Sequence, residues 1–168
     1  MRSFDLDRAT NQAFARLASE QGLQAEACAG PQEAVEGADL VVTATPSFRP
    51  IVEDAWIRPG MHLNAFGADT KGKHEIEAKV LARAKVVVDY LPQAREIGEC
   101  QHAFRGGLID GVHAELGEIV AGRKPGRESD AEITLFDATG IALQDLAVAL
   151  RAYEGALERG LGTRLQLD

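Results

Sequence analysis

Short runs of β-branched residues alternate along the chain with alanine-rich segments of helical periodicity, and this rhythm constrains the fold more than any other feature. The most apolar run, Asp-Leu-Val-Val-Thr-Ala-Thr at residues 39–45, predicts a central strand that is buried on both faces. Further strands are expected at residues 1–6, 24–28, 61–67, 85–90 and 133–137. Strands that alternate with helices build a parallel sheet with helices on its faces, so the sequence predicts an α/β protein.

Helical patterns fill the segments between these strands. Asp7 is placed to cap a helix that ends at Gly22, and its apolar face is expected to include Ala13, Phe14, Leu17 and Ala18. Other helices are predicted from Pro31 to Gly37 and over residues 75–84 and 114–121. A long amphipathic helix is predicted over residues 141–159, with apolar positions Leu143, Leu146, Ala147, Leu150, Tyr153 and Leu157. The length of 168 residues fits one domain that spans residues 1–168.

The charge balance excludes several classes of function. The chain has 18 Lys and Arg residues against 26 Asp and Glu, a net charge of −8, which argues against binding to nucleic acid or to an anionic membrane. The first residues resemble neither a signal peptide nor a transit peptide, and no segment resembles a membrane span, so a cytosolic protein is expected. Neither the two cysteines nor the four histidines have the spacing of a metal site, and none is predicted.

Polar residues at the ends of predicted strands are the candidates for chemistry. Asp69 follows the strand at residues 61–67, where parallel sheets bind their ligands, although a solvated turn aspartate fits the spacing equally well. Thr43 and Thr45 end the most buried strand and are placed to hydrogen-bond a ligand, but threonine is also a common strand residue. Asp5 or Asp7, after the first strand, has the position of the acidic residue that holds an adenosine ribose, whereas a helix cap is the alternative for Asp7.

Four segments in a fixed order carry a resemblance to a known family. They are residues 36–46 (EGADLVVTATP), 62–69 (HLNAFGAD) with Gly72-Lys73, 114–127 (AELGEIVAGRKPGR) and 133–145 (ITLFDATGIALQD). In this order they resemble the ornithine cyclodeaminase/mu-crystallin family, and residues 90–99 (YLPQAREIGE) look closest to the bacterial ornithine cyclodeaminases. The resemblance implies a Rossmann-type parallel sheet with flanking helices that is truncated before its second strand. It also implies that residues 140–160 form a helix that packs toward a substrate domain missing from this chain.

The resemblance also implies a chemistry and a set of site residues. The family reaction uses NAD in an internal hydride transfer that converts L-ornithine to L-proline and ammonia. Asp69 has the position of the proton carrier, and burial in the crevice would tune its pKa. The cofactor-binding positions carried over are Asp5, Thr43, Thr45, Asn64, Thr139 and Gly140.

The family contains segments that have no counterpart in this chain, and this difference leaves several functions open. The first Rossmann strand, its glycine-rich turn and the residues that hold the amino-acid carboxylate would all precede Met1. The isolated chain is therefore expected to be inactive as an enzyme and to bind NAD weakly. The alternatives are an imine reductase or alanine dehydrogenase activity, or a non-catalytic remnant like the crystallin branch. The expected partners are a small amino acid, a second copy of the chain in a homo-oligomer, or a separate N-terminal half.

Overall fold

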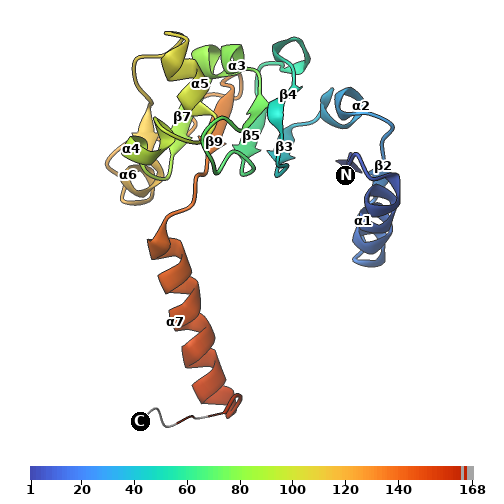
Figure 1. The fold of residues 1–168 in the computed structure, drawn as a ribbon, viewed down its shortest axis with the longest axis vertical. Helices are drawn as coiled ribbons and strands as arrows, with labels where there is room; N and C mark the ends of the chain where they lie inside the picture. Colours follow the sequence, from blue (N-terminus) through green and yellow to red (C-terminus); the bar gives the residue numbers. More distant parts are fainter. Residues whose placement is uncertain (164, 166–168) are drawn as a thin grey trace.

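The computed structural model of the chain describes residues 1–163 and 165, and it confirms an α/β fold built on parallel strands (Figure 1). Its main sheet has five strands in the order β3-β5-β9-β7-β8, and every neighbouring pair is parallel. These strands are β3 (Leu40–Thr43), β5 (His62–Ala65), β7 (Lys85–Val88), β8 (Ala114–Glu115) and β9 (Thr134–Asp137). Two smaller parallel pairs are β1 (Arg2–Ser3) with β2 (Glu26–Ala27), and β4 (Phe48–Val52) with β6 (His74–Ile76).

Short helices connect most of these strands. They are α1 (Arg8–Glu20), α2 (Pro31–Val35), a 3-10 turn (Asp54–Trp56), α3 (Ala78–Arg83), α4 (Leu91–Ala94), α5 (Cys100–Arg105) and α6 (Leu116–Val120). The long α7 (Ala142–Arg159) ends the described chain, where Gly160 adopts a left-handed conformation with φ of 64°. The predicted helix over residues 75–84 begins later than expected, because His74–Ile76 pairs with β4 as a strand. The strand β4 and the helices α4 and α5 were not predicted. The helix predicted over residues 114–121 also begins later than expected, because Ala114–Glu115 pairs with β7 as the strand β8.

The hydrophobic core lies on one face of the main sheet. Leu63, Leu135 and Val88, from the central strands, are at most 1% exposed, and Val80 and Leu81 of α3 are equally buried in the same cluster. The opposite face is less well covered. On β3 the side chains of Leu40 and Val42 are more than half exposed, at 57% and 56%. The prediction that residues 39–45 are buried on both faces was therefore wrong for β3, which packs on one face only.

The N-terminal unit of β1, β2 and α1 stands beside the main sheet and is not paired with it (Figure 1). Asp7 caps α1 as predicted, because its carboxylate accepts the N–H groups of Ala9 and Thr10 at 2.8 and 3.0 Å. The predicted apolar face of α1 is only partly buried: Ala18 is covered, whereas Phe14 and Leu17 are 50% and 56% exposed. The β1–β2 unit is too small to cover those side chains.

The helix α7 extends away from the sheet (Figure 1). None of its described residues is buried, and its apolar positions Leu143, Leu146, Leu150, Tyr153 and Leu157 are each more than half exposed. The amphipathic helix predicted over residues 141–159 is thus present and lacks a partner within the described residues. No helix in the described part of the chain is long and apolar enough to cross a membrane.

Candidate functional site

The candidate site lies at the carboxyl ends of three adjacent strands. Because β3, β5 and β9 are parallel neighbours, the loops that follow them emerge at the same edge of the sheet. These loops carry Thr45, Asp69 and Thr139. The sheet topology therefore brings three of the predicted site residues to one edge.

Asp69 is a solvent-accessible carboxylate paired with a lysine. Its Oδ1 lies 2.6 Å from the Nζ of Lys73 and accepts the hydroxyl of Thr70 at 3.0 Å. The hydrogen bond from Lys73, followed by the one from Thr70, lowers the pKa of Asp69. The Asp69 side chain is 56% exposed, so the expectation that burial tunes this carboxylate was wrong. At neutral pH, Asp69 is an ionised group that can accept a proton.

The helix α5 fixes the loop that carries Asp69. The buried amide of Gln101 accepts the N–H of Gly72 at 2.8 Å and donates to the carbonyl of Lys73 at 3.3 Å. The Nε2 of His102 lies 2.8 Å from the same Lys73 carbonyl. Lys73 is therefore held close to Asp69 through its own backbone.

Glu75 joins the ends of β3 and β5. Its fully buried carboxylate accepts the Thr43 hydroxyl at 2.8 Å, the Thr45 N–H at 2.5 Å and the Gly67 N–H at 2.8 Å. The Thr43 hydroxyl is thus used inside the protein, and this contact does not support a role for Thr43 in holding a cofactor. The Thr45 side chain is half-buried, and its hydroxyl accepts the N–H of Ser47 at 3.3 Å.

Two further buried carboxylates continue this network beneath the site. Glu99 accepts the N–H groups of Glu75 and Ile76 at 2.7 and 3.1 Å. Asp137 in turn accepts the N–H groups of Glu99 and Cys100 at 3.0 and 2.9 Å. Burial raises the pKa of Glu99 to about 8 and that of Asp137 to about 6.

Sequence reasoning missed all three buried carboxylates. Asp137 ends a predicted strand, and this position is the signal that could have identified it, but Glu75 lies at the start of a segment predicted as helix. Glu99 lies in the irregular region before α5, where no periodic pattern identified it as buried. Their burial depends on contacts between segments that are far apart in the sequence.

A fourth carboxylate holds the turn at Thr139 and Gly140. Asp89, at the end of β7, accepts the Thr139 hydroxyl at 2.7 Å and the Gly140 N–H at 2.6 Å. The amide of Gln93 donates to the carbonyl of Gly140 at 2.6 Å. Gly140 has φ of 80°, a conformation that favours glycine. Three hydrogen bonds therefore hold this turn, and its exposed Gly140 lies at the edge of the site.

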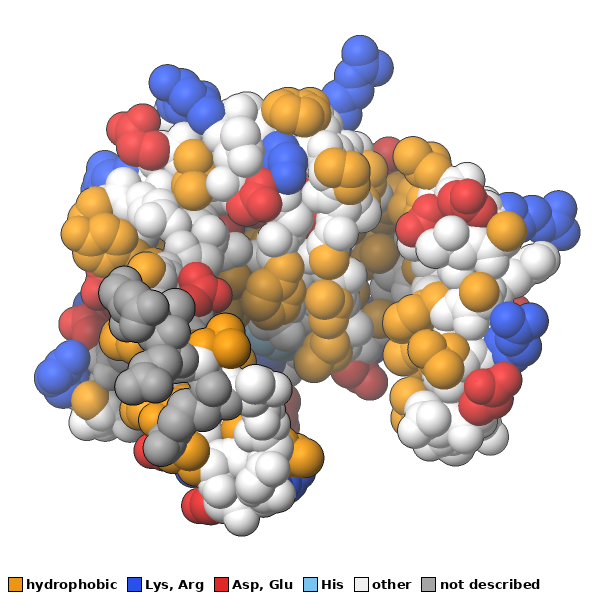
Figure 2. Space-filling view, turned by 60° about the horizontal axis from the view of Figure 1, so that its bottom comes forward, with side chains coloured by type: hydrophobic (Ala, Val, Ile, Leu, Met, Phe, Trp, Pro, Cys, Tyr) orange, Lys and Arg blue, Asp and Glu red, His pale blue; other side chains and the backbone are white. Residues whose placement is uncertain are grey.

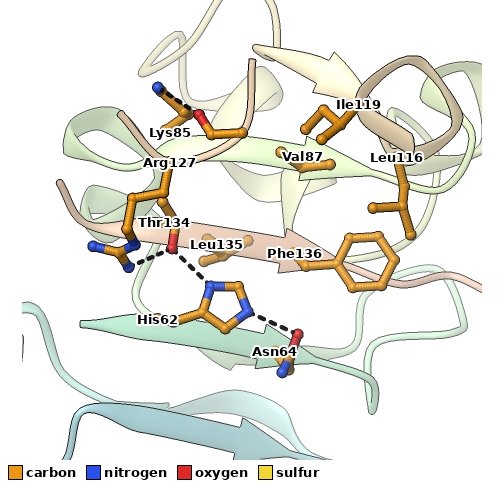
Figure 3. Close-up of a pocket in the computed structure, with 11 residues that line it drawn as sticks. His62, Asn64, Lys85, Val87, Leu116, Ile119, Arg127, Thr134, Leu135 and Phe136 are labelled. Atoms are coloured by element: carbon orange, nitrogen blue, oxygen red, sulfur yellow. Dashed lines mark hydrogen bonds between the residues drawn. The ribbon is translucent and has the colours of Figure 1, made fainter. Parts of the chain in front are cut away.

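Asn64 lies on the other face of the sheet, away from Asp69's loop. A cavity of about 310 Å³ opens there over β5, β9 and β7 (Figure 3). The Nε2 of His62 lies 3.1 Å from the Oδ1 of Asn64, while the Nδ1 of His62 lies 2.7 Å from the hydroxyl of Thr134. Leu116, Ile119 and Phe136 supply apolar walls.

Asp5 is separate from these residues. It follows β1 on the N-terminal unit, where its carboxylate is exposed and accepts the N–H of Asp7 at 2.7 Å. Its position at the carboxyl end of a parallel strand fits the role of holding a ribose. The site has no candidate for a metal, since the described residues contain no cluster of three or more His, Cys, Asp or Glu side chains suited to an ion.

Comparison with known proteins places this geometry in a family. The sequence profile of the ornithine cyclodeaminase/mu-crystallin family matches residues 1–160. Alanine dehydrogenase of Archaeoglobus fulgidus is 42% identical over 168 residues, which are 99% of this chain and 52% of that protein. Iminosuccinate reductase of Paracoccus denitrificans is 43% identical over 155 residues, 92% of this chain and 48% of that protein. The chain thus spans about half the length of these curated relatives.

Solved structures give the same result. An archaeal alanine dehydrogenase dimer with bound NAD superposes with a TM-score of 0.93 at 41% identity, covering 99% of this chain and 52% of that one. The Δ1-pyrroline-2-carboxylate reductase of Thermococcus litoralis, in complex with NADH and L-proline, gives a TM-score of 0.93 at 34% identity, with 98% and 52% coverage.

The comparisons also correct one expectation. Ornithine cyclodeaminase of Agrobacterium fabrum is 37% identical over 160 residues, which is below the values for alanine dehydrogenase and iminosuccinate reductase. The expected special closeness to ornithine cyclodeaminases was therefore wrong. The match over residues 1–160 and the agreement in structure nevertheless show that the chain belongs to the ornithine cyclodeaminase/mu-crystallin family.

Proposed function

We propose that this chain is the cofactor-binding and proton-transfer half of an NAD-dependent dehydrogenase that interconverts a small α-amino acid and its imine. The observation that carries this proposal is the Asp69–Lys73 pair at the edge where β3, β5 and β9 end, at a separation of 2.6 Å. Oxidation of an amino acid to an imine releases a proton from nitrogen, and an ionised carboxylate at this edge of the sheet is suited to accept it.

The residues of the site fit a dinucleotide in part. Bound NAD would supply the hydride acceptor, since related proteins have been solved with NAD or NADH bound. Asp5 would hold the adenosine ribose, while Thr45 and the Thr139–Gly140 turn would line the cofactor's path along the sheet edge. Asn64 lies on the other face of the sheet against His62, so we assign it no contact with the nicotinamide. Thr43 acts indirectly, because its hydroxyl binds Glu75.

Asp69 accepts the proton, and Lys73 keeps the Asp69 carboxylate ionised so that it can do so. The lysine lowers the pKa of Asp69, so the carboxylate is ionised before the reaction. In the reverse direction the protonated pair returns the proton to the nitrogen as the imine is reduced. The loop contacts made by Gln101 and His102 hold Lys73 in place during both steps.

The substrate class follows several of the curated relatives whose names state a reaction. Alanine dehydrogenase, iminosuccinate reductase and Δ1-pyrroline-2-carboxylate reductase, at 39–43% identity, all bear names that specify redox chemistry on amino or imino acids. We therefore favour reduction of a small imino acid over cyclisation of L-ornithine with loss of ammonia. Turnover is proposed for a whole protein of which residues 1–168 are one part, because these residues span about half the length of the curated relatives.

The test is a fused protein that completes the chain. The part of Archaeoglobus fulgidus alanine dehydrogenase that this chain does not match is joined to residues 1–168. The fusion is assayed with NADH on pyruvate plus ammonia and on Δ1-pyrroline-2-carboxylate, and with NAD on L-ornithine. We expect turnover of one of these substrates, and Asp69→Asn should lower kcat by about 100-fold or more.

The matched control is Asp130→Asn, which changes an exposed aspartate away from the site and should leave kcat unchanged. A folded fusion that turns over only L-ornithine would overturn the substrate class. Equal activity of the Asp69→Asn variant would overturn the role of that carboxylate.

A further inference from the structure

Two histidine rings stack against each other at the end of the loop that carries Asp69. His74 begins β6 and His102 lies in α5, and their ring centroids are 3.8 Å apart with an angle of 12° between the ring planes. The two residues are far apart in the sequence. The stack, which we call the histidine pair, therefore joins the end of this loop to the helix.

The histidine pair is turned toward the protein rather than toward solvent. The His74 side chain is only 15% exposed, and His102 is half-buried. Little histidine surface is visible on the face of the molecule shown in Figure 2, where hydrophobic side chains line both sides of a hollow. The contacts that the pair makes inside the protein therefore decide its role.

His102 uses one ring nitrogen to hold the lysine of the site. Its Nε2 lies 2.8 Å from the carbonyl oxygen of Lys73, and because a carbonyl only accepts, this nitrogen carries a proton and donates it. Gln101 donates to the same carbonyl at 3.3 Å, so the contact from His102 is the shorter of the two. The Lys73 side chain is only 18% exposed, and its Nζ lies 2.6 Å from the Oδ1 of Asp69. A shift of the Lys73 backbone would therefore reach the ion pair.

His74 supplies the flat face on which the His102 ring rests. The Nε2 of His74 is buried and has no hydrogen-bond partner among the described residues. The Oε2 of Glu99 lies 3.9 Å from it, which is beyond hydrogen-bond distance. Burying a nitrogen without a partner is unfavourable. The stack with His102, rather than a hydrogen bond from this nitrogen, is therefore what His74 contributes.

His74 is also uncharged at neutral pH. Burial, together with the neighbouring His102, lowers the pKa of His74 to about 4, and Glu77 acts in the opposite direction without outweighing burial. Burial raises the pKa of Glu99 to about 8, so the carboxyl that faces His74 is protonated and does not draw a proton to the ring. An uncharged His74 leaves the Lys73 ammonium as the neighbouring cation that acts on Asp69.

We propose that His74 is a positioning residue for proton transfer at Asp69. Its ring seats His102 against the Lys73 carbonyl, and this contact keeps the Lys73 ammonium on the Asp69 carboxylate. His74 touches neither substrate nor cofactor in this assignment. The inference deepens the proposed function and rests on it for the role of Asp69, whereas the contacts that link His74 to Asp69 do not depend on it.

NMR on residues 1–168 tests the proposal without substrate or cofactor. The exchange of the Lys73 ammonium protons with water is measured at about pH 6, and the carboxyl carbon of Asp69 is titrated toward acid. His74→Ala removes the ring, so we expect ammonium exchange to become at least about fivefold faster and the pKa of Asp69 to move up toward its ordinary value. His102→Phe keeps a ring but removes the donor, and it should have the same two effects.

Further variants separate positioning from a general loss of packing. His74→Phe keeps a flat ring and loses the unpartnered nitrogen, so it should retain the wild-type exchange and titration. In Lys73→Met, which has no ammonium, adding His74→Ala should leave the titration of Asp69 unchanged, because His74 acts through Lys73 alone. The matched control is His113→Phe. The Nε2 of His113 lies 2.8 Å from the carbonyl of Pro125 at the amino end of β8, away from Asp69, so its loss should change neither measurement.

Three results would overturn the proposal. They are wild-type exchange and titration in a folded His74→Ala variant, loss of both in a folded His74→Phe variant, and an effect of His74→Ala on Asp69 that persists in Lys73→Met. If His74→Ala is unfolded by circular dichroism, His74→Leu fills the space without a flat ring and is measured in its place. If acid unfolds the protein before Asp69 titrates, ammonium exchange alone decides. Because no activity is measured, failure of the positioning role is distinguishable from failure of the proposed function.

Discussion

The N–H of Gly67 donates to the Oε2 of Glu75 at 2.8 Å, and a Cβ on Gly67 would lie 2.5 Å from the Cδ of the same glutamate. The same Cβ would lie 2.2 Å from the carbonyl oxygen of Thr45. The glycine therefore allows the ends of β3 and β5 to approach the buried carboxylate that joins them.

We predict that Gly67→Ala destabilises the protein by about 2 to 4 kcal/mol, because the buried carboxylate and the Thr45 backbone have no room to move. Urea unfolding followed by circular dichroism measures the effect. Gly117→Ala is the matched control: it lies in α6 with no atom within 4 Å of its added Cβ, and it should be neutral or stabilising by up to about 1 kcal/mol. Equal stability of the Gly67→Ala variant and the wild type would contradict the close approach.

Glu99 gives a prediction about pH. Its pKa is raised to about 8 from an ordinary value of 4.5, so the folded protein keeps a proton that the unfolded chain loses as the pH rises. The contribution of Glu99 to stability therefore falls by up to about 1.4 kcal/mol per pH unit between pH 4.5 and 8. His74, which faces Glu99 at 3.9 Å, is neutral over this range because burial lowers its pKa to about 4.

Glu99→Gln should remove most of this slope, because the amide stays neutral in both states. Urea unfolding at pH 5.5, 6.5 and 7.5 gives the slope for the wild type and the variant. Asp137, with a pKa near 6, adds its own loss of stability mainly below that pH in both proteins. Identical slopes above pH 6 would show that Glu99 is ionised in the folded state.

The uncovered helix α7 predicts self-association. Leu143, Leu146, Leu150, Tyr153 and Leu157 expose an apolar stripe, and burying each such side chain contributes about 1.5 to 3 kcal/mol. We expect the chain to form dimers at tens of micromolar in the analytical ultracentrifuge, and Leu150→Glu to shift it to monomer. Val120→Glu serves as the control for an added charge at an exposed valine. A wild-type monomer across the dilution series would reject this prediction, and a dimer unchanged in Leu150→Glu would exclude α7 as its interface.

The sequence predicted the parts of the fold that depend on local pattern. Alternating runs gave the positions of β3, β5, β7 and β9, and the spacing of leucines gave α7. Asp7 was identified as a possible cap because capping depends on neighbouring residues alone. In contrast, β4 contains Pro50 and β6 contains His74 and Glu75, and they form a pair through segments separated by more than twenty residues.

The site residues that follow the strands were predictable from the sequence, whereas the buried carboxylates beneath the site were not. Asp69 and Thr45 follow strands, so the topology alone brings them to one edge. The ion pair with Lys73 was not foreseen, since loop geometry brings together side chains four residues apart. Burial of Leu40 and Val42 was predicted wrongly because periodicity reports that a strand is apolar, and not whether a second layer is present to cover it.

Under the proposed function, NAD binds to residues 1–168 together with a part equivalent to the one that this chain does not match in its relatives. Isothermal titration calorimetry of NAD into the isolated chain and into the fused protein tests it most directly. We predict no measurable binding to the isolated chain and a Kd of about 10 to 100 µM or tighter for the fusion, weakened at least about fivefold by Asp5→Ala. Micromolar binding of NAD by the isolated chain, or its absence in a folded fusion, would contradict the account.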